Sequence, residues 1–343
     1  MLHGHGDDLY RYNNITMNFS SNIYSHADMA QLKQHLCQHL SLIDSYPEPE
    51  PRSLANAIAQ QRGVSPDCIL VTSGATEAIY LIAQALRHCG YTHAHILQPT
   101  FNEYADACRM FGLQLTEDDC DATVTWLCNP NNPTGSLIPA SDEANTACTA
   151  KDTSRTLPAI RVVDQSYEDY TLARLMSPAE AVAKGNIFQL HSLTKTYAVP
   201  GLRIGYVVAA PHLINILRRF VRPWAVNALA IEAGLWLVSN NVKAIADLPA
   251  YLAEAERLHA MLSAIPGLSL LPTHTNFMLC HIEGHTAAEL KDYLARRHGI
   301  LIRDASNFVG LTPHHFRVAA QSPAENDALV AAIGEYLHPT TQL

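Results

Sequence analysis

The sequence contains no run of lysine and arginine residues, and no apolar stretch approaches the roughly 20 residues that a membrane span requires. Its 23 basic residues are outnumbered by 32 acidic ones, which gives a net charge of −9. Proteins that bind nucleic acid usually present a basic face, so this balance argues against DNA or RNA as a partner. The first eight residues, MLHGHGDD, lack the basic and apolar regions of a signal peptide. We therefore expect a cytoplasmic protein with no membrane partner.

Paired metal-binding or disulfide motifs are also missing. The eight cysteines form no CxxC pair, and most lie in apolar runs, which indicates reduced, buried thiols. The 18 histidines are scattered, and His3 and His5 form a close pair. A pair of histidines alone is a weak metal signal, so we expect no metal site.

The pattern along the chain is typical of an α/β protein. Apolar residues make up 48% of the 343 positions, enough for one large or two smaller cores. Short apolar runs at 68–71, 94–97, 124–127, 160–163, 187–190 and 203–208 are typical of strands, and segments 77–86 and 103–111 of helices. This alternation predicts a mostly parallel sheet flanked by helices on both faces.

After residue 211 the pattern changes. Long helical segments are expected at 212–242 and 248–265, followed by strands at 277–282, 300–303 and 316–319. A last helix begins at a capping box formed by Ser322 and Glu325, with Pro323 at its first position. The C-terminal part is therefore expected to form a smaller α+β domain.

The chemistry is expected just beyond the strands, because ligands of open α/β sheets bind at the carboxyl ends of the strands. Segment 72–77, TSGATE, opens a helix whose N-terminus attracts anions, although serine and threonine there are more often plain caps. Segment 128–135, CNPNNPTG, has more turn residues than a tight turn requires. Asp164, Tyr167 and Lys195 follow later strands. Taken singly, an aspartate there is usually a turn residue and a lysine is usually solvated.

Taken together, the ordered segments SGATE, NPNNPTG, DQSY, SLTK and PGLRIGY resemble the class I/II aminotransferases, a group of fold-type-I enzymes that use pyridoxal 5'-phosphate (PLP). The resemblance covers nearly the whole chain. Its most specific element is S-x-x-K followed by G-x-R-x-G, with Arg203 eight residues beyond Lys195. It implies a large PLP-binding domain at 45–225, a small domain formed by 1–44 and 226–343, and a homodimer.

The resemblance also implies roles for the residues around the PLP ring. Lys195 would hold PLP as an aldimine and later move the α-proton of an amino-acid substrate. Asp164 would pair with the pyridinium nitrogen, so that the ring can accept electrons. Asn132 and Tyr167 would bind the 3'-oxygen of the ring. Phe101 would stack on the ring, although a packed core aromatic fits its sequence context equally well.

The resemblance implies a further set of residues around the PLP phosphate. The PLP phosphate would be bound by Gly74, Ala75, Thr76, Ser192 and Arg203. Tyr46 would reach the partner subunit's PLP phosphate across the dimer interface; its alternative is a local packing role.

The substrate side is implied by three residues. Arg317 would bind the α-carboxylate by its bidentate fork, and an arginine between apolar strand residues favours such a role over packing. Asn22 would lie beside the substrate. Arg303 is a candidate for a substrate phosphate or second carboxylate, and its alternative is a solvated side chain.

Two branches of the family resemble the chain most: histidinol-phosphate aminotransferase and L-threonine-O-3-phosphate decarboxylase of cobalamin biosynthesis. Segments ILIRD (300–304), FRV (316–318) and SPAEN (322–326) fit both branches, whereas the leader HGHG (3–6) and FSSNI (19–23) favour the decarboxylase. YSHA (24–27) replaces the usual Asn-Pro-x-Gly, and DQSY replaces the usual Asp-Glu-Ala-Tyr. The sequence thus predicts an aminotransferase-family enzyme for an amino acid or its phosphate, with the decarboxylase as the alternative.

Two non-enzymatic interpretations are weaker. PLP-binding regulators usually carry a DNA-binding domain, for which there is no room before residue 19, and this chain is acidic. A scaffold without activity is disfavoured because every expected chemical residue is present.

Overall fold

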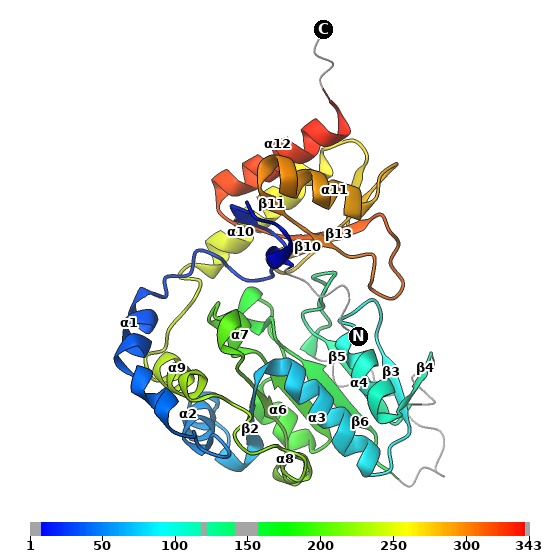
Figure 1. Cartoon of the computed structure of the whole chain (residues 1–343). Helices are drawn as coiled ribbons and strands as arrows, with labels where there is room; N and C mark the ends of the chain where they lie inside the picture. The colour runs from blue at the N-terminus through cyan, green and yellow to red at the C-terminus, as the bar shows by residue number, and fades with distance from the viewer. Residues whose placement is uncertain (1–7, 118–121, 141–156, 340–343) are drawn as a thin grey trace.

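A large sheet and a small sheet form separate layers of the molecule (Figure 1). The computed structural model describes residues 8–117, 122–140 and 157–339. The large sheet has the strand order β2-β8-β7-β6-β5-β3-β4. Its strands are β2 (Ile69–Thr72), β3 (His93–Ile96), β4 (Gln114–Thr116), β5 (Val124–Cys128), β6 (Ile160–Asp164), β7 (Ile187–His191) and β8 (Gly205–Val208). Only β8 runs antiparallel to its neighbours in this sheet, so the predicted mostly parallel α/β sheet is confirmed.

Helices bury both faces of the large sheet, as expected for a parallel sheet. In β2, Leu70 packs in the cluster with α3 (Gly74–His88), α4 (Glu103–Phe111) and α8 (Pro211–Arg218). Its neighbours Ile69 and Val71 pack on the opposite face, against α1 (Ala30–Gln38), α2 (Arg52–Arg62) and α9 (Ala228–Ser239). Helix α6 (Pro178–Lys184) covers the same face further along the sheet, through Ala181.

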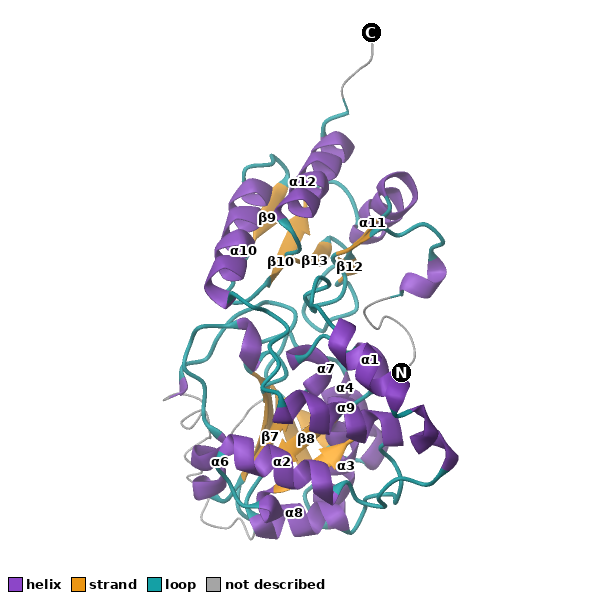
Figure 2. Cartoon of the chain, turned by 90° about the vertical axis from the view of Figure 1, so that its left-hand side faces the viewer, coloured by secondary structure: helices purple, strands orange, loops and turns teal. Residues whose placement is uncertain are grey.

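The small sheet is antiparallel and includes strands near the C-terminus. Its order is β12-β13-β10-β9, from β9 (Leu268–Leu270), β10 (Phe277–Ile282), β12 (Arg303–Asp304) and β13 (His315–Ala319). Helices α10 (Leu248–Ser263), α11 (Ala287–Tyr293) and α12 (Pro323–Leu337) lie around it in Figure 2. The N-terminal strand β1 (Met17–Asn18) pairs in parallel with β11 (Ile300–Leu301), which brings the start of the described chain to this part of the molecule.

Short helical turns complete the described elements. They are the 3-10 turns η1 (Leu9–Arg11), η2 (Leu40–Asp44), η3 (Pro66–Cys68), η5 (Glu168–Tyr170) and η6 (Pro200–Leu202), the helical turn α7 (Leu193–Thr196) and the π-helical turn η7 (Leu294–His298).

Two predicted elements are divided in the structure. The segment expected as one helix at 212–242 forms α8 and α9, because Pro223 cannot donate a helical hydrogen bond and Trp224 adopts a left-handed backbone (φ 62°). Asn227 then starts α9 by accepting a hydrogen bond from the Ala230 amide at 2.8 Å. The strand expected at 300–303 is also split: β11 pairs with β1, whereas β12 pairs with β13.

Helices α1 and α9 pack against the large sheet, although the predicted boundaries assign both to the small domain. The buried side chains of α9, such as Ile231 and Leu237, share one cluster with Leu32 of α1 and Leu54 of α2. Both faces of the large sheet need an apolar cover, and these helices provide part of it. We keep the division into two domains as a proposal, with α1 and α9 moved to the large one.

No helix in the described ranges is both long and apolar enough to cross a membrane. Of the six cysteines in those ranges, four are buried and all six are free; Cys37, however, is exposed, so the prediction of buried thiols is wrong for that residue. His3, His5, Cys120 and Cys148 lie outside the described residues.

Candidate active site

A cavity of about 930 Å³ lies between the carboxyl edge of the large sheet and the small sheet. It is lined by all of the predicted site residues except Gly74 and Tyr46: Asn22, Ala75, Thr76, Phe101, Asn132, Asp164, Tyr167, Ser192, Lys195, Arg203, Arg303 and Arg317. Asp164 ends β6, and Asn132 and Ser192 follow the parallel strands β5 and β7. The sheet rule that predicted the site from the sequence therefore holds in the structure.

One end of the cavity is built for an anion. Helix α3 begins at Gly74, so the first amides of the helix, at Ala75 and Thr76, are directed to this end. Arg203 has a left-handed backbone (φ 55°) that brings its guanidinium against Gly74; a Cβ at Gly74 would meet Arg203 Nη2 at 2.8 Å. Because Gly74 has no side chain, it leaves room for the Arg203 guanidinium beside the start of α3. The side chain of Ser192 lies 2.7 Å from Thr194 Oγ1 and adds a hydroxyl at this end.

The carboxylate of Asp164, at the end of β6, also lines the cavity. Its Oδ2 accepts a hydrogen bond from Tyr104 Oη at 2.6 Å, and its Oδ1 accepts one from the Ser166 amide at 2.8 Å. These two donors fix the orientation of the carboxylate.

Tyr104 was not predicted as a site residue. The available signal was its spacing of three from Phe101, which places the two rings 5.8 Å apart.

Tyr167 and Lys195 line the same cavity and lie close to each other. The Lys195 Nζ is 5.6 Å from the centre of the Tyr167 ring. Burial raises the pKa of Tyr167 to about 12, so the phenol keeps its proton at neutral pH and can donate it to an oxygen in the cavity. Tyr167 Oη also accepts a hydrogen bond from Asn22 Nδ2 at 3.3 Å. Asn22 was predicted from sequence, and the structure brings it to Tyr167 across 145 positions of the chain.

The small sheet contributes two buried arginines. Arg303 on β12 and Arg317 on β13 are directly opposite each other in the antiparallel pair. Arg317 donates to Asn132 Oδ1 and to the Ser20 carbonyl (2.7 Å), and Arg303 donates to Asn307 Oδ1 at 2.7 Å. Burial lowers the pKa of Arg317 to about 10, and the charge of Arg303 acts in the same direction.

Some polar atoms at this site lack a protein partner. Asn22 Oδ1 and Arg317 Nε are buried without a hydrogen bond among the described residues. A buried polar atom without a partner is costly, so both atoms indicate room for a polar ligand. The anion-binding helix start, the fixed carboxylate and the lysine fit PLP, which carries a phosphate, a ring nitrogen and an aldehyde at separate positions of its ring.

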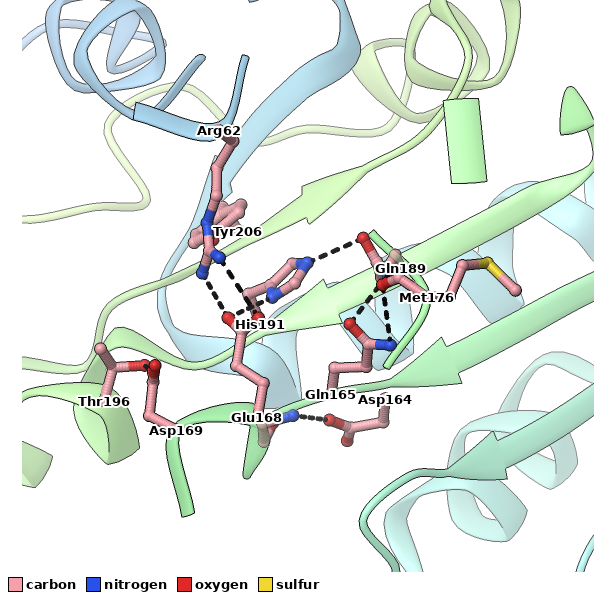
Figure 3. A network of polar contacts seen from close by, with 11 residues as sticks. Arg62, Asp164, Gln165, Glu168, Asp169, Met176, Gln189, His191, Thr196 and Tyr206 are labelled. Carbon is pink, nitrogen blue, oxygen red and sulfur yellow. Dashed lines mark hydrogen bonds and ion pairs between the residues drawn. The ribbon is translucent and has the colours of Figure 1, made fainter. Parts of the chain in front are cut away.

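A buried charged network lies behind the cavity (Figure 3). Glu168 accepts hydrogen bonds from Arg62 and lies 2.8 Å from His191 Nδ1, and His191 stacks on Tyr206 at 4.7 Å. Burial alone would raise the pKa of Glu168, but His191 and Arg62 hold it at about 2. Because Glu168 follows Tyr167 and His191 precedes Ser192, the network fixes two loops that line the cavity.

Tyr46 lies away from the cavity. Its side chain is 86% exposed and its ring is 5.3 Å from that of Trp224. Its predicted contact involves the partner subunit, so the position of Tyr46 in a single chain leaves that role a prediction.

Comparison with known proteins gives a consistent result. The family model described as aminotransferase class I and II matches residues 14–333. The threonine-phosphate decarboxylase of Salmonella typhimurium is 31% identical, with 94% of this chain and 91% of that protein covered. The crystal structure of L-threonine-O-3-phosphate decarboxylase from Porphyromonas gingivalis superposes with a TM-score of 0.86 at 34% identity, covering 94% of this chain and 99% of that one.

The other branch is represented as well. The histidinol-phosphate aminotransferase of Stenotrophomonas maltophilia is 33% identical, with 84% of this chain and 83% of that protein covered. The matched region spans both sheets and every residue that lines the cavity. The chain belongs to the aminotransferase class I and II family, the PLP-dependent enzymes that its motifs resemble.

Proposed function

We propose that the protein acts on a phosphorylated α-amino acid, and that its reaction is the decarboxylation of L-threonine O-3-phosphate. The observation that carries this proposal is the pair of buried arginines, Arg303 and Arg317, that stand opposite each other at the cavity.

Two guanidinium groups this close together would be stabilised by two bound anionic groups. Residues opposite each other in an antiparallel pair have Cβ atoms about 4.5–5.5 Å apart, and like charges there are destabilising. Arg317 donates to Asn132 and to the Ser20 carbonyl, and Arg303 donates to Asn307 and to the Asp304 carbonyl. A ligand with two negative groups would offset the repulsion, because charge-assisted bonds to carboxylate or phosphate are the strong ones.

The short spacing also indicates the kind of substrate. In L-threonine O-3-phosphate the carboxylate and the phosphate sit on neighbouring carbons, so one compact molecule can present both groups to the two arginines. We infer that Arg317, next to Asn132 and Tyr167, takes the carboxylate, and that Arg303, towards Asn307, takes the phosphate.

The residues of this chain would hold PLP in one orientation. We infer that Arg203, Ser192 and the start of α3 bind its phosphate, and that Asp164 keeps its ring nitrogen protonated. The Tyr167 hydroxyl would donate to the ring oxygen, and Lys195 would bind PLP covalently and deliver or remove a proton at the substrate α-carbon. When bound, PLP supplies an acceptor for the electron pair that the broken bond leaves at that carbon.

A second candidate is transamination of histidinol phosphate, which the Stenotrophomonas maltophilia relative supports. The name of the relative with 94% coverage and that of the structure with a TM-score of 0.86 favour the decarboxylase. Histidinol phosphate carries no carboxylate, so it would offer Arg317 no anionic partner in that half-reaction.

Product analysis separates the two candidates. We expect L-threonine O-3-phosphate to give carbon dioxide and 1-aminopropan-2-yl phosphate with no amino-group acceptor present. Formation of glutamate from histidinol phosphate and 2-oxoglutarate, without carbon dioxide release from phosphothreonine, would instead establish the second candidate. Turnover of neither phosphorylated compound by PLP-loaded protein would overturn the proposal.

We also propose a cytoplasmic homodimer. Large apolar side chains are exposed along η2 and just beyond it: Leu40, Leu42, Ile43, Tyr46 and Trp224. An apolar patch of this kind usually marks a protein interface. A second copy of the chain would cover it, and Tyr46 would then be close to the partner subunit's PLP phosphate.

A further inference from the structure

Two histidines and a glutamate meet on the outer side of the large domain, where helices α1 and α9 lie side by side (Figure 2). His35 is on α1, His39 is the residue directly after its end, four positions further on, and Glu232 is on α9. One ligand atom from each of the three lies within 4.8 Å of the others. None of them lines the cavity of the active site.

The ring of His39 is already oriented for metal binding. Its Nδ1 lies 2.8 Å from the carbonyl oxygen of His35 and donates to it, because a carbonyl can only accept. That hydrogen bond leaves Nε2 of His39 with its lone pair. A metal-ligating histidine is commonly oriented in this way, with its other nitrogen bonded to a backbone carbonyl.

The distances fit a small cation after minor side-chain rotation. Glu232 Oε1 is 2.6 Å from His35 Nε2 and 4.0 Å from His39 Nε2. Zinc binds nitrogen and carboxylate oxygen at about 2.0–2.1 Å, so tetrahedral ligands are roughly 3.3 Å apart. The distance from Glu232 Oε1 to His35 Nε2 must therefore lengthen by roughly 0.7 Å, and the distance from Glu232 Oε1 to His39 Nε2 must shorten by about as much. The three side chains are 20%, 41% and 24% exposed, which leaves access for a water as fourth ligand.

We propose that His35, His39 and Glu232 bind one zinc ion, which joins α1 to α9. The ion takes the place of the proton between His35 Nε2 and Glu232 Oε1, and that proton leaves to solvent. Imidazole nitrogen with one carboxylate oxygen is a donor set that suits zinc. The sequence predicts no metal site, because these three residues become neighbours only when α1 packs on α9 across 197 positions of the chain.

The site is structural in this account. It ties the segment that leads to η2 and Tyr46 onto a helix of the large domain, so it stabilises the folded chain without touching the reacting groups. Zinc should therefore raise the unfolding temperature of the PLP-loaded, tag-free protein. At a free zinc concentration of about 100 times Kd the rise should be at least about 3 °C.

The test is a zinc titration of the full chain by calorimetry against two ligand variants. We expect one zinc per chain in the wild type, and a loss of affinity of about tenfold or more in both His39→Gln and Glu232→Gln. His281 and His315 are a matched control, since they are a neighbouring pair with ring centres 5.0 Å apart that belongs to no cluster with a carboxylate in the described chain. The double variant His281→Gln/His315→Gln should bind zinc like the wild type.

Equal zinc binding by the wild type and both ligand variants would overturn the proposal, as would no binding by the wild type at all. Crystals of the wild type soaked in zinc give a measurement that does not depend on the variants. An anomalous peak between His35, His39 and Glu232 supports the site, and its absence while zinc appears elsewhere contradicts it.

Discussion

Charged side chains organise the active site at the scale of single residues. Arg203 supplies positive charge beside the start of α3, Asp164 supplies negative charge at the end of β6, and the buried Arg303 and Arg317 form a second positive region on the small sheet. Because each charged residue has a different proposed role, removing each one should change a different property of the enzyme.

Asp164→Asn should keep PLP but lose about 10²-fold or more in kcat, because the negative partner of the ring nitrogen is gone. The new amide would also direct a donor at Tyr104 Oη or the Ser166 amide, which both donate to Asp164 now. Arg203→Ala should instead release PLP more readily, with roughly 10-fold to 100-fold weaker binding. Absorbance titration of the apoprotein with PLP, alongside kcat, distinguishes the two. Loss of PLP with unchanged kcat in Asp164→Asn would contradict its assigned role.

Arg303→Ala and Arg317→Ala should separate phosphate from carboxylate recognition. Arg317→Ala should abolish activity on every α-amino acid. Arg303→Ala should mainly lower kcat/KM for phosphothreonine, because only that substrate has a phosphate for Arg303 to bind. The loss should correspond to about 1–3 kcal/mol of transition-state binding free energy. The measurement is kcat/KM for phosphothreonine and for threonine in each variant. Equal losses on both substrates in Arg303→Ala would mean that Arg303 is structural.

At the scale of elements, the active site is held by loops that a buried ion network fixes. Glu168 has a pKa of about 2, below its ordinary 4.5, so its ion pairs contribute stability fully above about pH 4.5. That contribution is lost as the pH falls towards 2. A shift of this size corresponds to about 3 kcal/mol.

Glu168→Gln should therefore be less stable than the wild type near pH 7 by an amount of that order, and the difference should shrink as the pH falls from 4.5 towards 2. Thermal unfolding of both proteins across this range measures it. Glu256→Gln, at an exposed position on α10, is the control and should differ little from the wild type at any pH. A constant gap between Glu168→Gln and the wild type across the range would show that the ion pairs do not set the acid dependence.

The elements also show what could be predicted from sequence. Strands β5, β6 and β7 are buried on both faces, which agrees with their largely apolar runs, and the polar residues predicted after them lie together at the cavity. The break between α8 and α9 was missed, although Pro223 marked it, because apolar periodicity continues on both sides. Tyr104 was missed because its hydroxyl partner, Asp164, is 60 positions away.

At the scale of the whole molecule, contacts between distant segments determine which residues meet at the cavity, and these contacts could not be predicted from the sequence. The pairing of β1 with β11 brings Asn22 to the cavity, and the opposition of Arg303 and Arg317 depends on the register of β12 and β13. Patterns within a segment specify its own structure but not its partner, so the spacing of His35 and His39 did not point to Glu232.

A shared active site makes the proposed homodimer testable by complementation. Lys195→Ala and Tyr46→Ala chains should each be inactive alone. If Tyr46 serves the partner subunit, a hybrid dimer has one site with both residues intact, so statistical mixing should restore about a quarter of wild-type activity. Activity after subunit exchange is the measurement, with gel filtration as the control for the dimer. A monomer at working concentration, or exchanged dimers without activity, would contradict the shared site.

The most direct test of the central claim is to locate the bond between the protein and PLP. Borohydride reduction of the purified protein, followed by digestion and mass spectrometry, fixes the pyridoxyl group on the lysine that carried it. The site geometry predicts a single label, on Lys195, and no label in Lys195→Ala. A label on any other lysine would contradict the assignment of the active site.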